Sequence, residues 1–266
     1  MSSVRRIVFL LALMVMAMGA GYITYYFASQ AERGAVYSEI RSLVIDERPD
    51  QDMASTVDEP GSEVIISEEE KYISPIDFAS LRKINDEIYA WIEIEGTDIS
   101  YPLVQSLTED SYYLDHTIEG KQGYPGSIYT LMVNSRSFTD FNTVIYGHNM
   151  KNGTMFGSLK RYRDENYLKE HRTLRIFTPY GEKTYTVFAA VVFDNRLLTD
   201  AFSNGEESGR NAFLKEIKAV RDLDSIVLDD IPVTSDDRII TLSTCISGKP
   251  RNRYLVIAVL TDEKGR

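Results

Sequence analysis

The sequence is poor in several features that mark common protein classes. It has a single cysteine, Cys245, so no disulfide can form within the chain. Its three histidines are too few and too scattered for a zinc site built from Cys and His. Lys and Arg total 29 against 40 Asp and Glu, which argues against a general nucleic-acid binder because neutralising phosphates requires a basic surplus. A glycine-rich phosphate loop is also missing, so nothing in the sequence indicates a nucleotide cofactor.

One long apolar run is present, at the N-terminus. Residues 7–28 carry no charge, and 22 residues at a rise of about 1.5 Å make a helix of about 33 Å, enough to cross a bilayer core. Arg5 and Arg6 precede the run and favour a cytoplasmic N-terminus. We therefore expect residues 1–6 to be cytoplasmic and 7–28 to be a single-pass signal anchor. The alternative is a signal peptide that is cleaved near Ala28-Ser29-Gln30-Ala31.

A strongly acidic segment follows. Residues 46–70 contain ten Asp or Glu and one Arg, which accounts for most of the net charge of −11. Such a segment repels itself and is typical of an extended tether, the alternative being an acidic tail that binds a partner. We expect residues 29–71 to form a stalk and linker and residues 72–266 to form the globular domain.

Short β-type runs dominate the globular part. They predict eight strands, at 90–94, 99–104, 127–133, 142–146, 173–178, 183–193, 238–244 and 254–260. Apolar spacing predicts a helix over 75–88 and another over 205–221, where Asn204-Gly-Glu-Glu207 is similar to a capping box. Because the strands lack regular intervening helices, the fold is predicted to be mostly β, an antiparallel barrel or sandwich and not a doubly wound sheet.

The last two predicted strands bring a thiol close to a guanidinium. Cys245 ends one strand, and a predicted loop over 246–252 leads to the apolar strand 254–260. If the two strands pair antiparallel, Cys245 and Arg253 share one rim of the sheet. The thiolate is the nucleophilic form of cysteine and a neighbouring positive charge favours it, while a guanidinium can also donate hydrogen bonds to an oxyanion.

His148 is the candidate proton-transfer group, since imidazole titrates near neutral pH. It directly follows the predicted strand 142–146 but lies 97 residues before Cys245, so only the fold can bring the two together. Each of these side chains also has an ordinary interpretation, as a buried cysteine, a loop histidine or a surface arginine. His116 and His171 lie in polar or charged stretches, and we assign them no role.

These residues resemble the sortases, membrane-anchored cysteine transpeptidases of Gram-positive bacteria, and class B in particular. The segment 146–156, Tyr-Gly-His-Asn-Met-Lys-Asn-Gly-Thr-Met-Phe, is similar to the class B histidine motif, and 241–245, Thr-Leu-Ser-Thr-Cys, to the family's TLxTC motif. Arg253 occupies the place of the family's arginine, and we prefer it to the nearby Arg251 because it abuts the last strand.

The resemblance covers about residues 72–261 and extends to the predicted elements. Residues 91–97 and Tyr101-Pro102 resemble the family's first strands, and the helix predicted over 205–221 resembles the long helix that class B members insert before the penultimate strand. The implied fold is an eight-stranded sortase-like antiparallel β-barrel with N-terminal helices.

The implied activity is a two-step acyl transfer. Cys245 would attack a Thr carbonyl in a C-terminal sorting signal similar to LPxTG or NPxTx and form a thioester. His148 would protonate the leaving amine, and Arg253 would hold the substrate backbone and the oxyanion. The resemblance implies neither a cofactor nor a metal. Three neighbours of the nucleophile are candidate substrate-binding residues: Ser243, Thr244 and Ile246.

The resemblance also implies partners and a location. The partners are surface proteins that bear a sorting signal and an amine of a peptidoglycan crossbridge or its lipid-linked precursor, with no nucleic acid. The protein would be a single-pass protein of the cell membrane with an extracellular catalytic domain over 72–266. Two alternatives stay open: a membrane-tethered cysteine peptidase that hydrolyses the same intermediate, and a non-catalytic β-barrel binding module in which Cys245 is structural.

Overall fold

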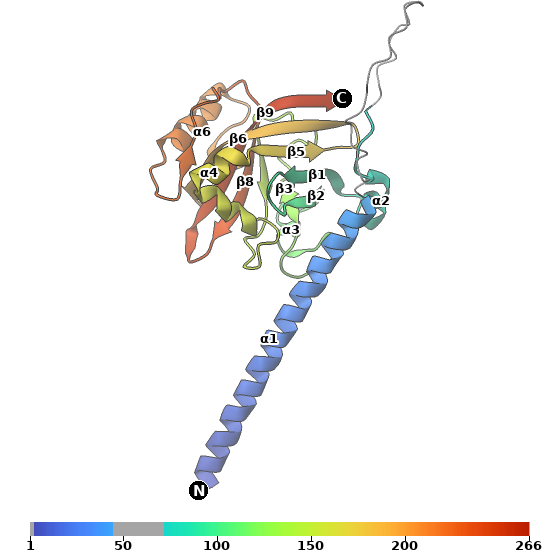
Figure 1. Ribbon diagram of the computed structural model, residues 1–266, viewed down its shortest axis with the longest axis vertical. Coiled ribbons are helices and arrows are strands. Elements are labelled where there is room, and N and C mark those ends of the chain that lie inside the picture. Colours follow the sequence, from blue (N-terminus) through green and yellow to red (C-terminus); the bar gives the residue numbers. More distant parts are fainter. Residues whose placement is uncertain (1–2, 45–71, 266) are drawn as a thin grey trace, which may run out of the picture. The chain divides into compact units, whose positions relative to one another are not determined.

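The structure is a computed structural model that describes residues 3–44 and 72–265 (Figure 1). The chain divides into two compact units, Met1–Leu43 and Val44–Arg266. The acidic segment predicted to be a linker, 46–70, lies outside the described residues.

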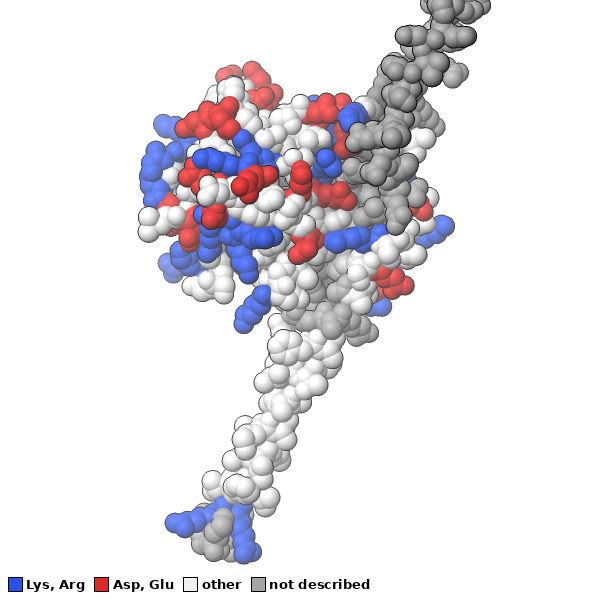
Figure 2. All heavy atoms as spheres, viewed as in Figure 1, with Lys and Arg blue, Asp and Glu red and all other residues white. Residues whose placement is uncertain are grey.

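The first unit is helical. Helix α1 (Ser3–Val44) runs through the predicted anchor, and its stretch Arg5–Ala28 is long and apolar enough to cross a membrane. In Figure 2 the charged side chains of this stretch lie at its N-terminal end and are basic. Length and composition therefore agree with the predicted membrane anchor, and the helix continues past residue 28 into the predicted stalk.

The second unit is built on strands. The described residues contain β1 (Ile88–Ile94), β2 (Ser100–Val104), β3 (Ile128–Thr130), β4 (Asn142–Tyr146), β5 (Thr173–Phe177), β6 (Gly181–Asp194), β7 (Ile226–Val227), β8 (Ile239–Ile246) and β9 (Lys249–Gly265). They are ordered β5-β1-β2-β3-β4-β8-β9-β6-β7, and β5 also pairs with β6. Eight strands therefore close into a barrel, as predicted, and the two-residue β7 is added outside the closure on β6.

The strand directions are mixed. Most neighbours pair antiparallel, but β2 pairs with β3 and β4 pairs with β8 in the parallel sense. Parallel neighbours need long crossover connections, and both of these pairs are joined by long segments that contain helices. The prediction of an eight-stranded barrel is confirmed, while its purely antiparallel form is corrected at these two pairs. As a consequence, β4 and β8 end at the same edge of the barrel.

The helices and helical turns of this unit are short. They are α2 (Phe78–Ile84), α3 (Tyr112–Asp115), the 3₁₀ helix η1 (Gly157–Arg163), α4 (Glu165–Glu170), α5 (Leu198–Ala201) and α6 (Glu207–Ala219). Only α2 and α6 have counterparts among the predicted helices. The other four span seven residues or fewer, and so does α2, whose apolar spacing continues into β1.

The predicted helix over 75–88 is wrong at its C-terminal end. Helix α2 stops at Ile84, and Asn85 takes an extended conformation. The Asn85 side chain then accepts a hydrogen bond from the Glu87 backbone N–H, and Ile88 already belongs to β1. The apolar spacing thus spans the end of a helix and the start of a strand.

Helix α6 forms as predicted but is shorter than 205–221, and the predicted capping box is absent. The cap residue is Glu206, which makes no side-chain cap hydrogen bond. The Asn204 side chain donates instead to the backbone carbonyl of Asn142 at the start of β4. The same asparagine therefore joins the α6 segment to the barrel.

The core explains why α6 lies against the barrel. Its buried residues Phe213, Leu214 and Ile217 belong to one apolar cluster with side chains of β4, β6, β8 and β9. Strand β9 lies between β8 and β6, and its apolar run Tyr254–Val259 is completely buried. The continuous apolar run in the sequence thus marks a strand with covered faces on both sides.

Candidate active site

The parallel pairing of β4 with β8 builds one edge of the site. Tyr146, the last residue of β4, lies opposite Ser243, and the Gly147 backbone N–H donates to the Ser243 carbonyl at 3.2 Å. The loop that carries His148 therefore starts beside the end of the strand that carries Cys245. This register brings together segments that lie almost a hundred residues apart in the sequence.

Cys245 and Arg253 are direct partners across the antiparallel pair β8–β9. The predicted loop over 246–252 is wrong, because β8 runs to Ile246 and β9 begins at Lys249, which leaves only a two-residue turn. Gly248 in this turn has φ +76°, a conformation that favours glycine. The sharing of one rim by the thiol and the guanidinium, which was inferred from spacing, agrees with this register.

The register shifts by several residues directly after Cys245. Ile246 lies opposite Lys249, so the residues between Lys249 and Arg253 bulge out of the ladder. The Cys245 side chain is exposed, while its neighbours Thr244 and Ile246 are buried. The strand alternation thus points the thiol out of the core.

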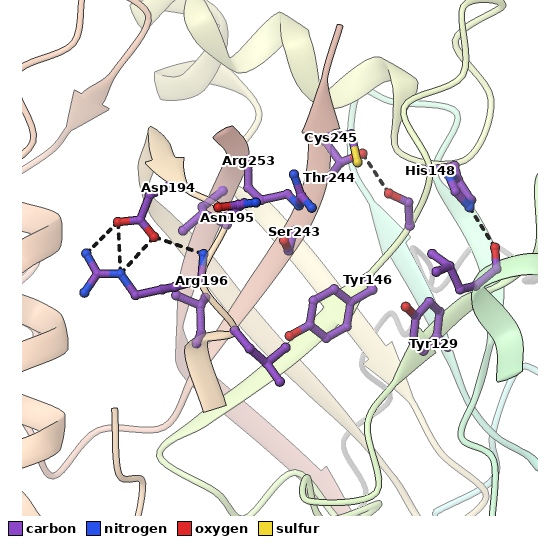
Figure 3. A pocket seen from close by; sticks show the side chains of 15 residues that line it. Tyr129, Tyr146, His148, Asp194, Asn195, Arg196, Ser243, Thr244, Cys245 and Arg253 are labelled. Atoms are coloured by element: carbon purple, nitrogen blue, oxygen red, sulfur yellow. Dashed lines mark hydrogen bonds and ion pairs between the residues drawn. The ribbon is translucent and has the colours of Figure 1, made fainter. Parts of the chain in front are cut away.

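A pocket of about 210 Å³ opens at this edge (Figure 3). Cys245, His148 and Arg253 all line it. Its remaining lining comes from α3, β3, the end of β4, the segment from the end of β6 to the start of α5, and β8 and β9: Leu114, Tyr129, Tyr146, Gly147, Asp194, Asn195, Arg196, Leu197, Leu198, Ser243, Thr244 and Leu255.

Two stacked tyrosines form part of the pocket wall. The rings of Tyr129 and Tyr146 lie 5.4 Å apart. Burial raises the pKa of Tyr129 to about 12 and also raises the pKa of Tyr146, so both hydroxyls stay protonated at neutral pH. Within the described residues the buried Tyr146 hydroxyl has no hydrogen-bond partner. Both tyrosines and the segment 194–198 were absent from the predicted site, because residue types and strand alternation do not tell which strand faces and connections line a pocket.

His148 is held by a backbone carbonyl. Its Nε2 lies 2.8 Å from the Leu114 carbonyl oxygen of α3, and its ring contacts Tyr124 edge-on at 4.7 Å. A carbonyl oxygen can only accept, so Nε2 carries a proton in this arrangement. Figure 3 shows the imidazole directed at this carbonyl.

Among the described residues, the Arg253 guanidinium donates to two backbone carbonyls. Nη1 lies 3.0 Å from the Asn252 oxygen and 3.2 Å from the Pro250 oxygen. None of the ion pairs formed by the described residues involves Arg253, so no carboxylate in this part of the chain is paired with it. Arg251 is exposed and does not line the pocket, which agrees with the preference for Arg253.

The predicted substrate-binding residues fall into two groups. Ser243 and Thr244 line the pocket, but the Thr244 hydroxyl already donates to the Gly147 carbonyl at 2.7 Å. The Ile246 side chain is buried and does not line the pocket.

The other two histidines lie outside the pocket lining. His116 Nδ1 contacts the Asp115 carboxylate and the Tyr112 carbonyl, each at 2.8 Å. His171 packs against the Tyr167 ring. Within residues 3–44 and 72–265, the His, Cys, Asp and Glu side chains form no group of three or more that could hold a metal ion.

Comparisons with known proteins identify the family. The sortase domain family model matches residues 92–261. The chain is 35% identical over 172 residues to sortase B of Listeria monocytogenes, a match that covers 64% of this chain and 67% of the relative. It is 33% identical over 186 residues to sortase B of Staphylococcus aureus, covering 69% and 72%. A crystal structure of sortase B from B. anthracis superposes with a TM-score of 0.69 at 29% identity and covers 90% of this chain and 100% of the other.

The chain therefore belongs to the sortase family, the transpeptidases that anchor surface proteins to the cell wall. Its relatives place it in class B. Members of this family act on surface proteins that bear a sorting signal and on amines of the cell wall, and they are cell-surface enzymes.

Proposed function

We propose that this protein is a cysteine transpeptidase. It cleaves a C-terminal sorting signal similar to LPxTG or NPxTx and transfers the acyl group through a thioester on Cys245 to a cell-wall peptide amine. One observation carries the proposal: a single pocket is lined by the exposed Cys245, by its register partner Arg253 and by His148.

In the first half-reaction, the Cys245 thiolate attacks the carbonyl carbon of the signal's Thr. A carbon–sulfur bond forms, the peptide carbon–nitrogen bond breaks, and protonated His148 gives its proton to the leaving amine. Because Nε2 donates to the Leu114 carbonyl, Nδ1 is the nitrogen that can exchange a proton without breaking that bond. We therefore assign the proton transfer to Nδ1.

The tetrahedral intermediate carries a negative oxygen that has to be stabilised. Arg253 supplies a charge that no described carboxylate neutralises, and it lies beside the nucleophile. The backbone N–H of Ile246 is the second donor in this proposal. Ser243 lies in the pocket wall and would contact the bound signal.

In the second half-reaction, a cell-wall amine attacks the thioester and His148 accepts its proton, by microscopic reversibility. The thioester conserves the energy of the cleaved peptide bond, so acyl transfer needs no nucleotide. Water in place of the amine would make the protein a peptidase.

We also propose the arrangement of the chain. Residues 1–6 are cytoplasmic, 7–28 span the membrane, 29–71 are the stalk and linker, and the catalytic domain 72–266 is extracellular. The apolar stretch Arg5–Ala28 supports the anchor. An extracellular domain tethered to the membrane could reach both an anchored precursor and a lipid-linked acceptor.

Trapping tests the proposal. The full chain is incubated with LPxTG and NPxTx peptides, with and without triglycine, and analysed by mass spectrometry, with Cys245→Ala as the control. We expect an acyl adduct on Cys245 that is transferred to triglycine. An adduct released only to water would support the peptidase, and absence of an adduct in a stably folded protein would support the binding module.

A further inference from the structure

The loop that carries His148 is hydrogen-bonded to β8 on both sides of the histidine. On the N-terminal side, Gly147 makes two hydrogen bonds to β8: its N–H donates to the Ser243 carbonyl, and its carbonyl accepts from the Thr244 hydroxyl at 2.7 Å. A Cβ at Gly147 would lie 2.5 Å from the Ile128 side chain. A larger residue here would therefore displace Ile128 or the Phe156 ring, whose Cγ would lie 2.8 Å from that Cβ.

On the C-terminal side, the hydrogen bond is made by the Asn149 side chain. Its Nδ2 donates to the backbone carbonyl oxygen of Cys245 at 2.9 Å. This carbonyl stands where the β8–β9 register shifts, directly after Cys245, so the ladder is irregular there. A side-chain amide thus holds the peptide group of the candidate nucleophile while the thiol stays exposed.

The backbone of Asn149 is itself anchored. Asn149 forms an isolated bridge with Met155, and the Phe156 N–H donates to the His148 carbonyl at 3.0 Å. Met155 and Phe156 are buried. A Cβ at Gly157 would lie 2.3 Å from the Met150 carbonyl oxygen, so the loop closes tightly on itself. The backbone that carries the Asn149 side-chain amide is therefore held in place by these contacts.

We propose that Asn149 is a positioning residue for the acyl transfer. Its amide fixes the Cys245 peptide relative to the His148 loop, so that sulfur and imidazole keep one separation through both half-reactions. Asn149 does not line the pocket, so it acts through Cys245 and not through the substrate. A small misplacement of a reacting group is costly, since a shift of about 1 Å can lower the rate about 100-fold. This inference rests on the proposed function.

The test separates positioning from binding and from folding. We expect Asn149→Ala to lower kcat about tenfold and to leave KM for the signal peptide within about twofold. Single-turnover acylation and transfer to triglycine should slow by the same factor, because one geometry serves both steps. Asn149→Asp, which keeps the size but loses the donor, should be impaired at least as much, and Asn149→Gln should recover part of the rate.

Asn152→Ala is the matched control. It removes the same side-chain group from the same loop, where Asn152 accepts hydrogen bonds from Thr154, and we expect wild-type kcat. Wild-type kcat in Asn149→Ala would overturn the inference, as would a loss of melting temperature that accounts for the loss of activity. In either case an inactive Cys245→Ala would leave the proposed function standing, whereas an active Cys245→Ala would contradict that function itself.

Discussion

The two ends of the β8–β9 pair differ in how their basic side chains are paired. At one end, Arg238 precedes β8 and donates to the Glu263 carboxylate of β9 at 2.6 Å, and the buried Lys183 of β6 donates to the same carboxylate. At the other end, Arg253 faces Cys245, and its acceptors in the described part of the chain are two backbone carbonyls. At the first end both cations are paired with a carboxylate and hold strands together, while the second end has a positive charge beside a thiol.

The same contrast appears within the pocket. Arg196 and Arg253 both line it. Arg196 is paired with the Asp194 carboxylate at 2.5 Å and with the Glu216 carboxylate of α6 at 3.0 Å. The hydrogen bond from Arg196 lowers the pKa of Asp194 below its usual range, so this carboxylate stays charged. Arg196 therefore fixes the wall to α6, whereas Arg253 forms no ion pair with any described carboxylate.

The largest effect is expected at the thiol. Cys245→Ala should abolish transfer of the signal peptide to triglycine, because it removes the sulfur that forms the thioester. The side chain is exposed, so the melting temperature should change little. Peptide transfer and thermal unfolding measured on the same preparation check both statements. Residual transfer by the variant would show that the nucleophile lies elsewhere.

The next largest effect is expected at the imidazole. His148→Ala should lower kcat by about 10²–10⁴, the usual contribution of a positioned acid–base group. Binding of the signal peptide to Cys245→Ala/His148→Ala should match its binding to Cys245→Ala. Steady-state kinetics and calorimetric titration measure the two quantities. A His148→Ala variant with unchanged kcat would remove the imidazole from the mechanism.

A smaller effect is expected at Arg253, the arginine at the Cys245 end of the β8–β9 pair. Arg253→Ala should lower kcat/KM by about 10²–10³, the scale of losing an oxyanion donor. The matched control is Arg251→Ala, which removes an exposed guanidinium two residues away and should stay within twofold of wild type. The opposite ranking would assign the stabilisation of the oxyanion to Arg251 and not to Arg253.

The smallest effect is expected at the end of the β8–β9 pair where Arg238 and Lys183 contact Glu263. Hydrogen bonds from Lys183 and Arg238 lower the pKa of Glu263 below its ordinary 4.5. A lowered pKa contributes stability above about pH 4.5 that is lost as the pH falls through the folded-state pKa. Glu263→Gln should cost about 1 kcal/mol at pH 7, or about 2–4 °C in Tm, without changing kcat. The difference in Tm should shrink in acid. A constant difference down to pH 3 would contradict the assigned charge.

The barrel was predictable because its strands differ in pattern from their surroundings. The segment 142–146 is both the predicted and the observed range of β4, and the apolar run 254–260 marks the central β9. Strand directions were not predictable, because the parallel pairing of β4 with β8 depends on where a long connection returns. The predicted strand 127–133 shrinks to β3, because the Met132 N–H donates to the Asp110 carboxylate and not to a neighbouring strand.

The candidate site was predictable only as far as its reactive side chains. Cys245 and Arg253 follow from hairpin spacing, and His148 was added for its chemistry and from the resemblance to sortases. The hydrogen bonds that organise them were not visible in the sequence, because Leu114 and Gly147 contribute through their backbone carbonyls. Any residue type has such a carbonyl, so no pattern of residue types can reveal it.

The mixed topology has a consequence for how the protein folds. Cys245 and Arg253 meet through a two-residue turn. His148 joins them only when β4 pairs with β8, which closes the long connection over 147–238. Short-range pairing is fast, and long-range closure is entropically costly and slow. A newly synthesised chain is therefore expected to assemble its thiol and guanidinium early and its imidazole late. The onset of acyl transfer during refolding would then report the closing of the barrel itself.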